Sequence, residues 1–208
     1  MVILSDSIRN PAFDPTDGVF IAQDCRPATL RDISVASLSP FVRALLIIDG
    51  TVTKYIEAYT NEPVTVHRLE QTSHALGDDH RWLDAPRGTR IFQRQSTLVG
   101  LHTGCLRVFA ESLIVMERLS SRMQQGLESE PGGLGKILFD SGIETRREGL
   151  WFGREQLTGL PKPVAALCDG DFLSRTYRVI SNGVPLMMIT ERFPYHGDFR
   201  AGNLATVE

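Results

Sequence analysis

The clearest pattern in the chain is Leu173-Ser-Arg-Thr-Tyr-Arg-Val-Ile-Ser-Asn-Gly-Val-Pro-Leu-Met-Met-Ile-Thr-Glu-Arg-Phe193, in which Asn182-Gly183 separates two β-rich runs. Asn-Gly is the favoured dipeptide of two-residue hairpin turns, because both residues accept positive φ angles. We therefore predict an antiparallel hairpin of residues 173–181 and 184–193. Both faces of the second run are apolar, which predicts a central place in the sheet for that strand.

The rest of the chain shows further strand and helix patterns. Strands are predicted near 64–67, 91–101 and 106–115. Helices are predicted over 40–48, 52–59, 119–127 and 134–139, and Ser39 and Pro40 fit the start of the first one. Helices, strands, helices and strands in this order, with short links between neighbouring strands, predict an α+β fold with an antiparallel sheet.

The composition is that of an ordinary soluble globular protein. The 208 residues are 42% hydrophobic and 23% charged, which excludes global disorder and favours a single domain. The net charge of −3 argues against a protein that works by binding nucleic acid, for which a basic surface is typical. Residues 40–59 have the spacing of a helix-turn-helix, but Lys54 is the only base of the second helix, which favours a plain helical hairpin.

The expected compartment follows from the N-terminus and the cysteines. No run of eighteen apolar residues is present and no signal-peptide pattern begins the sequence, so we expect neither a membrane span nor secretion. Cys25, Cys105 and Cys168 are odd in number and far apart, which argues against a zinc cage and a disulfide framework. We expect a cytoplasmic protein with reduced thiols.

Residues 1–36 show no helical or strand period. Pro11, Pro15 and Pro27 punctuate them. We predict an irregular N-terminal arm that is either loose or laid over the core, followed by a single domain of residues 37–208.

Two charged residues fall in predicted strands, where a charge is costly. Glu191 shares a strand face with Met187 and Ile189, so it points into apolar surroundings or a cavity, unless it reaches solvent at the strand end. Arg94 shares a face with Phe92, and a planar guanidinium there suits either a carboxylate ligand or a cross-strand ion pair. Together the two would suit a small acid with a hydroxyl group at its far end.

Other charged or glycine-rich clusters carry weaker signals. The histidines and aspartates within 74–80 have no convergent fourth ligand, so we expect a polar loop and no metal site. Gly132-Gly133-Leu134-Gly135 precedes a helix without Walker or Rossmann spacing, although its N–H groups are placed to face an anion. The pair Arg146-Arg147 is interpreted as a solvated strand edge.

Seven blocks of the chain share the pattern of one known family. They are Phe41-Val-Arg-Ala-Leu-Leu-Ile-Ile-Asp-Gly-Thr-Val-Thr-Lys54, Glu62-Pro-Val-Thr-Val66, Ala110-Glu-Ser-Leu-Ile114, Gly133-Leu-Gly-Lys-Ile-Leu138, Glu144-Thr-Arg-Arg-Glu148, Ser174-Arg-Thr-Tyr-Arg-Val-Ile180 and Pro185-Leu-Met-Met-Ile-Thr-Glu-Arg-Phe-Pro194. In order and spacing they resemble the chorismate pyruvate-lyase family, most of all the actinobacterial and cyanobacterial branch that makes 4-hydroxybenzoate for secondary metabolism. The resemblance covers about residues 38–194 and leaves the N-terminal arm without a counterpart.

The resemblance implies a fold and two catalytic residues. The fold would be a chorismate lyase-like six-stranded antiparallel sheet covered on one side by helices, with the ligand enclosed beneath a helical flap. Arg94 matches the arginine that binds the ring carboxylate. Glu191 matches the glutamate that contacts the 4-hydroxyl group.

The resemblance also implies a set of ligand contacts and two departures from the family. Leu134, between Gly133 and Gly135, matches a leucine that contacts the ligand. Val52 stands where the family has methionine, which would reshape the pocket. Glu111 stands where the ubiquinone-pathway enzymes have an arginine beneath the flap, which leaves the group that binds the enolpyruvyl end of the substrate unidentified.

The implied reaction converts chorismate to 4-hydroxybenzoate and pyruvate by elimination with aromatisation, without a cofactor. Two alternatives stay open. One is a non-catalytic binding module for an aromatic acid, because the ligand-sensing domains of some transcription regulators look similar to this fold. The other is a divergent lyase for a related chorismate-derived acid. We expect a small-molecule substrate and neither nucleic-acid nor membrane partners, and the sequence leaves the oligomeric state open.

Overall fold

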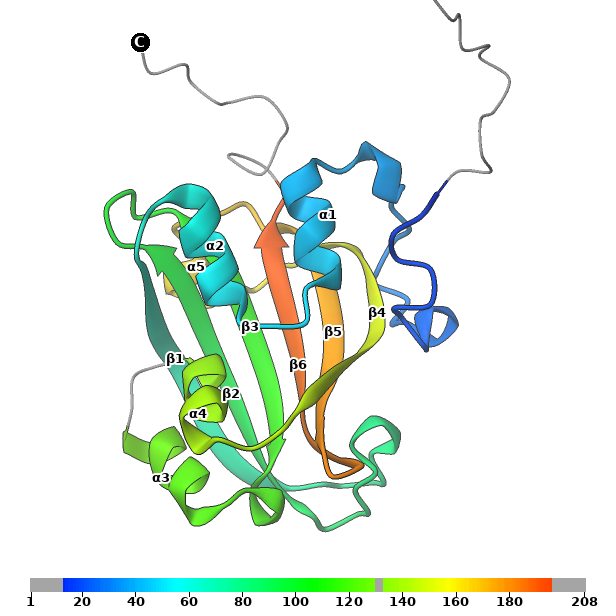
Figure 1. Cartoon of the computed structure of the whole chain (residues 1–208), viewed down its shortest axis with the longest axis vertical. Coiled ribbons are helices and arrows are strands. Elements are labelled where there is room, and N and C mark those ends of the chain that lie inside the picture. The colour runs from blue at the N-terminus through cyan, green and yellow to red at the C-terminus, as the bar shows by residue number, and fades with distance from the viewer. Residues whose placement is uncertain (1–12, 130–132, 196–208) are drawn as a thin grey trace, which may run out of the picture.

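The structure is a computed structural model that describes residues 13–129 and 133–195. Six strands form one antiparallel sheet in the order β1-β2-β3-β6-β5-β4 (Figure 1). The α+β fold with an antiparallel sheet is confirmed, and β6 is central, as its two apolar faces predicted. The strands are β1 (Val64–Ala75), β2 (Arg90–Gly100), β3 (Leu106–Val115), β4 (Arg146–Gln156), β5 (Asp171–Ser181) and β6 (Val184–Pro194).

The hairpin of β5 and β6 turns at Asn182 and Gly183, which have φ angles of 49° and 78°. Ile180 pairs with Pro185, but the next residue of β5, Val179, pairs with Met187. An extra residue, Leu186, therefore forms a β-bulge in β6. A bulge is where a central strand tolerates proline, which has no N–H group to donate to the ladder.

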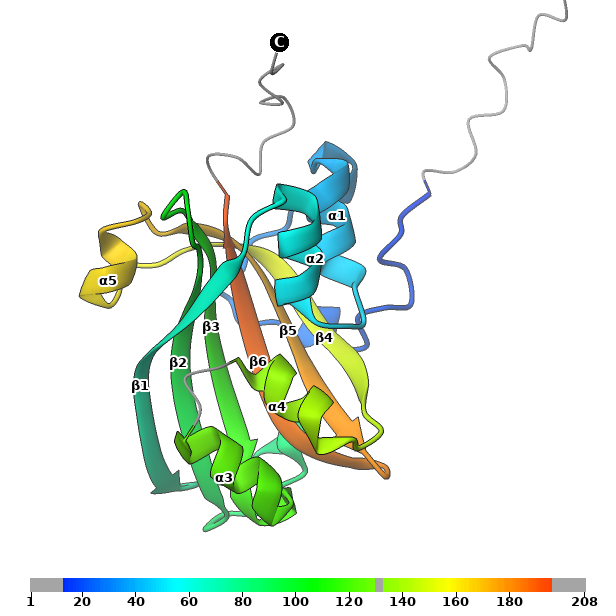
Figure 2. The same ribbon diagram turned by 60° about the vertical axis from the view of Figure 1, so that its left-hand side comes forward.

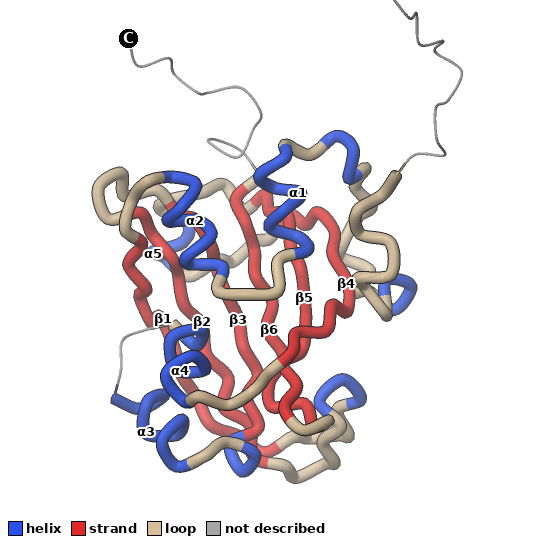
Figure 3. Tube along the Cα trace, in the orientation of Figure 1, coloured by secondary structure: helices blue, strands red, loops and turns tan. Residues whose placement is uncertain are grey.

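The helices lie mainly on one face of the sheet. They are α1 (Pro40–Ile47), α2 (Val52–Thr60), α3 (Ser121–Ser129), α4 (Leu134–Ser141) and the short α5 (Lys162–Ala165), with 3₁₀ turns at Gln23–Cys25, Val35–Ser37, Arg81–Leu83 and Met116–Arg118. As predicted, the Ser39 side chain caps α1 by accepting a hydrogen bond from the Val42 N–H group at 3.3 Å. Figures 2 and 3 show α1 to α4 in front of the strands, with α1 and α2 at one end and α3 and α4 at the other.

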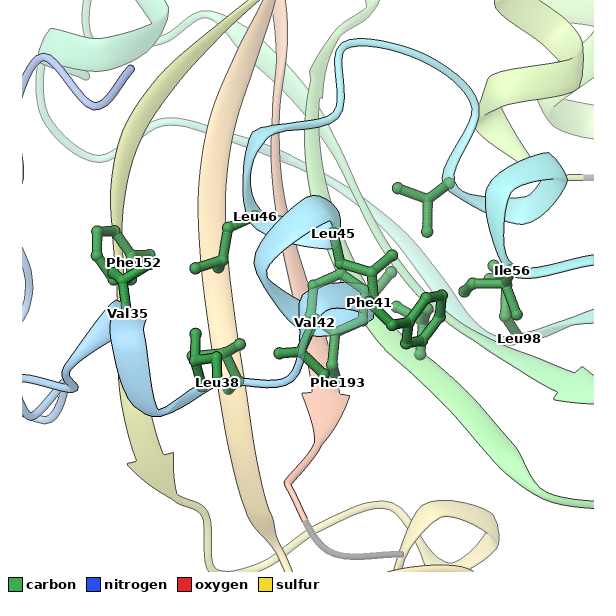
Figure 4. Close-up of a cluster of buried hydrophobic side chains, with 14 residues drawn as sticks. Val35, Leu38, Phe41, Val42, Leu45, Leu46, Ile56, Leu98, Phe152 and Phe193 are labelled. Carbon is green, nitrogen blue, oxygen red and sulfur yellow. The ribbon is translucent and has the colours of Figure 1, made fainter. Parts of the chain in front are cut away.

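The largest core cluster joins α1 and α2 to the middle of the sheet. Phe41, Leu45 and Leu46 of α1 pack beside Phe193 of β6, and Ile56 of α2 packs near Leu98 of β2 (Figure 4). Leu45 and Ile56 have no exposed surface. These contacts fix the end of α1, and the connection that follows it, over β5 and β6.

Of β4, only a strand edge at Arg146-Arg147 was predicted from the residues, and this strand carries the N-terminal segment along its outer edge. The Ile21 N–H group donates to the Gly149 carbonyl at 3.0 Å, and Arg31 pairs with Arg154. A Cβ atom at Gly149 would lie 2.7 Å from the Val19 carbonyl oxygen, so this approach requires glycine. Residues 13–36 are thus laid against the sheet, while residues 1–12 of the predicted arm lie outside the described residues.

Candidate functional site

Two side chains of β5 hold Glu191 in place. The register sets Arg175 directly opposite Glu191. The Nε and Nη2 atoms of Arg175 lie 2.9 and 2.8 Å from Oε2 of Glu191, and the Tyr177 hydroxyl donates to Oε1 at 3.1 Å. Glu191 is 8% exposed and Arg175 3% exposed. The carboxylate is therefore buried in an ion pair, and Arg175 is a partner that sequence reasoning did not identify.

Arg175 and Tyr177, the two partners of Glu191, are each kept in this role by their surroundings. Nη1 of Arg175 donates to the carbonyl groups of Leu46 and Ile48 at 3.1 and 3.2 Å, which ties the end of α1 to the sheet. Burial, and then the charge of Glu191, raise the pKa of Tyr177 well above its usual value of 10. Tyr177 therefore keeps its proton and serves as a hydrogen-bond donor to Glu191.

An inner cavity of about 60 Å³ lies between this part of the sheet and the helices. Glu191 is in its floor, and Val52 and Gly133–Gly135 are in its roof. Five of the six residues predicted for the site therefore face one cavity. The rest of its wall is made by Gly50, Thr51, Thr53, Ser96, Leu98, Ala110, Ser112, Leu138, Arg147, Tyr177 and Ile189.

The sixth predicted residue, Arg94, lies on the same face of the sheet but behind the cavity wall. It pairs across the strands with Ser112, which lines the cavity. At 1% exposure it is the largest of the nearly inaccessible side chains. Burial, and then the charge of Arg68, lower the pKa of the Arg94 guanidinium.

An outer cavity of about 350 Å³ adjoins the inner one. Its walls come from residues 18–21 of the N-terminal segment, residues 46–49 at the end of α1 and just beyond it, the start of β4, and Arg175 and Tyr177 of β5. Arg147 and Tyr177 line both cavities and so stand at their junction. This volume is within the range of small-molecule pockets, roughly 300–1,000 Å³.

The interpretation of Arg146-Arg147 as a solvated edge is wrong for the second residue. The Arg147 side chain is only 17% exposed, and its Nη1 lies 3.2 Å from Oδ1 of Asp49. The Arg146 side chain is 60% exposed and pairs with Glu148. Successive side chains of a strand point to opposite faces, so one arginine of the pair faces the helices.

Glu111 lies on the opposite face of the sheet from both cavities. Its neighbours in β3, Ala110 and Ser112, line the inner cavity, and strand alternation turns Glu111 away. There it accepts hydrogen bonds from Gln95 and Arg192. Glu111 is therefore not part of the site, and it cannot take over the role of the family arginine that it was expected to replace.

The polar loop predicted around the histidines contains His80 but not His74, which belongs to β1, and it is held by its own hydrogen bonds. Nδ1 of His80 accepts from the Leu83 N–H group at 3.2 Å, and Asp79 accepts from the Arg87 N–H group at 2.8 Å. In residues 13–129 and 133–195, no three side chains of His, Cys, Asp or Glu are grouped to hold a metal ion. Nor does this part of the chain contain a helix with the length and apolar character that a bilayer span requires.

The fold and the site together define a class, an α+β protein whose helix-covered antiparallel sheet buries a carboxylate–arginine pair beside two cavities. Solved structures share the fold. The effector domain of PhnF from Mycobacterium smegmatis has a TM-score of 0.54 at 12% identity over 70% of this chain and 89% of that domain. The ligand-binding domain of a GntR-family regulator from Bordetella bronchiseptica has a TM-score of 0.53 at 14% identity over 67% and 91% of the two chains. At these identities only the fold is shared.

Relatives in sequence identify the family. The chorismate pyruvate-lyase of Mycobacterium leprae (strain TN) is 30% identical over 171 residues, or 79% of each chain. That of Mycobacterium tuberculosis (strain H37Rv) is 30% identical over 173 residues, 79% of this chain and 84% of the relative. The model of the family described as chorismate pyruvate-lyase Rv2949c-like matches residues 46–199. The chain belongs to this family.

Proposed function

We propose that this protein is a chorismate pyruvate-lyase that converts chorismate to 4-hydroxybenzoate and pyruvate. The observation that carries the proposal is the inner cavity, which Glu191, Val52 and Gly133–Gly135 face together, with Arg94 buried on the same sheet face. A cation and a carboxylate on one covered face suit a ring that carries a carboxylate at one end and a hydroxyl group at the other.

In the proposed reaction the ring loses the proton at C4 and the C3–O bond to the enolpyruvyl group breaks. The electrons of the C–H bond complete the aromatic ring, and the proton passes to the methylene carbon of the leaving group, which becomes pyruvate. Aromatisation drives the elimination, so the reaction calls for no redox cofactor or metal. The protein has to orient a flexible diacid and exclude water.

Glu191 is better placed to orient the substrate than to remove the C4 proton. Oε2 is already contacted by Nε and Nη2 of Arg175, and Oε1 accepts from Tyr177, which leaves a lone pair on Oε1 for a substrate hydroxyl. Protonation of the carboxylate would weaken its ion pair with Arg175. We therefore assign Glu191 the role of accepting the 4-hydroxyl hydrogen bond, and Arg94 that of binding the ring carboxylate through its planar fork.

The test is to incubate the protein with chorismate and to follow 4-hydroxybenzoate and pyruvate by liquid chromatography. Equimolar formation of both is the expected result. Arg94→Met, which keeps the volume of the side chain, and Glu191→Gln are expected to reduce kcat/KM at least 100-fold. Arg90→Met is the matched control, because Arg90 is an exposed arginine at the start of the same strand.

The outcomes separate the candidate functions. No turnover together with tight binding of 4-hydroxybenzoate would refute the lyase and favour an aromatic-acid binding module. Full activity of a folded Arg94→Met variant would refute the assigned site. Circular dichroism and a thermal melt of each variant distinguish loss of the site from loss of the fold.

A further inference from the structure

The proposed substrate carries two carboxylates, and the site described so far assigns a group to only one of them. Chorismate has a carboxylate on the ring and a second one on the enolpyruvyl group that leaves. Arg94 is assigned to the first. The second requires another cation within reach of the inner cavity, and Glu111, on the other face of the sheet, is excluded by both its position and its charge.

The charged groups around the outer cavity differ in how fully they are paired. Arg175 is occupied by Glu191 and by two backbone carbonyl groups. Glu148 is paired with Arg146 and Arg178. The acid opposite Arg147 is Asp49, whose side chain is 61% exposed.

Arg147 therefore has capacity for a further anion. The contact of its Nη1 with Asp49 is 3.2 Å long, and its buried Nε has no hydrogen-bond partner among the residues the structure describes. Asp49 is mostly exposed, so water competes for its contact with Arg147, and a carboxylate ligand can take the place of Asp49 at small cost. The guanidinium carbon lies 6.0 Å from the centre of the Tyr177 ring, next to the partner of Glu191.

The position of Arg147 matches a ligand with two acidic ends. Arg94 and Arg147 lie on the same face, on strands β2 and β4, which are four strand spacings apart in the sheet. At about 4.8 Å per spacing their Cα atoms are separated by roughly 19 Å. Glu191, on β6, lies between these two positions in the strand order.

We propose that the outer cavity is the subsite for the three-carbon, carboxylate-bearing end of the substrate, and that Arg147 is its binding group. This inference rests on the proposed function. The ring would occupy the inner cavity, the C3–O bond would lie near the junction at Arg147 and Tyr177, and pyruvate would leave through the outer cavity. Asp49, in the connection between α1 and α2, then serves as the counterion of Arg147 when the subsite is empty.

The experiment compares a ligand with one carboxylate to a substrate with two. In Arg147→Gln we expect the KM for chorismate to rise at least tenfold, while the Kd for 4-hydroxybenzoate, which lacks the second carboxylate, changes less than twofold. Inhibition of the wild-type reaction by pyruvate is expected to disappear in the variant. Arg122→Gln, at an exposed arginine of α3, controls for the loss of one positive charge.

A second variant tests the counterion. Asp49→Asn removes the competing carboxylate, so the KM for chorismate is expected to fall, by at most about fivefold, the equivalent of an exposed ion pair. A rise in KM would contradict the assignment.

Failure of the proposed function and failure of the inference about Arg147 give different experimental results. If the wild-type protein does not turn over chorismate, the proposed function falls and this inference falls with it. If the wild-type protein is active and Arg147→Gln loses affinity for 4-hydroxybenzoate in parallel with chorismate, or changes neither, the inference alone is overturned. A melting temperature of Arg147→Gln close to that of the wild type shows that the measured loss belongs to the subsite.

Discussion

Removal of Arg175 should destabilise the protein chiefly through the charge that it leaves behind. Arg175→Met keeps most of the volume of the side chain but leaves Glu191 buried at 8% exposure, with only the Tyr177 hydroxyl as a partner. Breaking a buried ion pair from one side costs about 3–5 kcal/mol. That is a large fraction of the roughly 5–15 kcal/mol by which domains are stable. We therefore expect the free energy of unfolding to fall by about 4 kcal/mol at pH 8.

The origin of this loss can be tested by a double-mutant cycle in urea. In Arg175→Met with Glu191→Gln neither charge of the buried pair remains, so most of the stability should return, apart from the hydrogen bonds that Arg175 donates to the carbonyl groups at the end of α1. We expect a coupling of about 2–3 kcal/mol between the two positions.

The pH dependence gives an independent check. In Arg175→Met, protonation of the buried carboxylate of Glu191 removes the unpaired charge. The penalty is therefore largest at high pH, where the carboxylate is charged, and shrinks as the pH falls. The loss should be smaller at pH 5 than at pH 8. A coupling below about 0.5 kcal/mol, or an equal loss at both pH values, would refute the reasoning.

Two further predictions concern positions away from the cavities. Burial alone would raise the pKa of Glu62, but hydrogen bonds from Arg107 and from the N–H groups of residues 102–103 lower it to about 2. Glu62→Gln should therefore be less stable than the wild type at pH 7. This difference in stability should disappear as the pH falls from about 4.5 towards 2. Equal differences in melting temperature at pH 7 and pH 3 would contradict this. Gly149→Ala places a Cβ atom 2.7 Å from the Val19 carbonyl oxygen, so it should cost about 1–3 kcal/mol and speed proteolysis within residues 13–36. Gly77→Ala, where a Cβ meets nothing within 4 Å, is the control, and equal protease resistance of the two variants would count against the contact.

Local signals were sufficient for the elements with a distinctive turn or cap. Asn182-Gly183 predicted the hairpin of β5 and β6, and Ser39-Pro40 predicted the start of α1. Beyond the strand edge at Arg146-Arg147, β4 was missed because it begins with charged residues and contains Gly149 and Gly153, which weaken a strand pattern. Both glycines lie where the N-terminal segment crosses, a contact far apart in sequence that no local pattern reveals.

The partner of Glu191 was missed for a more specific reason. A regular two-residue hairpin that begins with the pair Ser181 and Val184 would place Arg175 opposite Thr190. The extra residue Leu186 shifts the register by one and brings Arg175 opposite Glu191 on the same face. A proline in a central strand is the one sequence signal of such a bulge, and Pro185 carries it.

The two edges of the sheet are protected in different ways. The outer edge of β4 bonds to the N-terminal segment through the Ile21 and Ala22 N–H groups, whereas the outer edge of β1 has no partner strand among the described residues. An unpaired edge is a template on which another chain can add a strand. β1 counters this with exposed polar side chains, among them His67, Arg68 and Glu70. Loss of the N-terminal segment would therefore expose the edge of β4 as a second template, and the glycines of this strand offer little steric resistance to the approach of another chain. The consequence would be self-association into aggregates rather than a simple loss of stability.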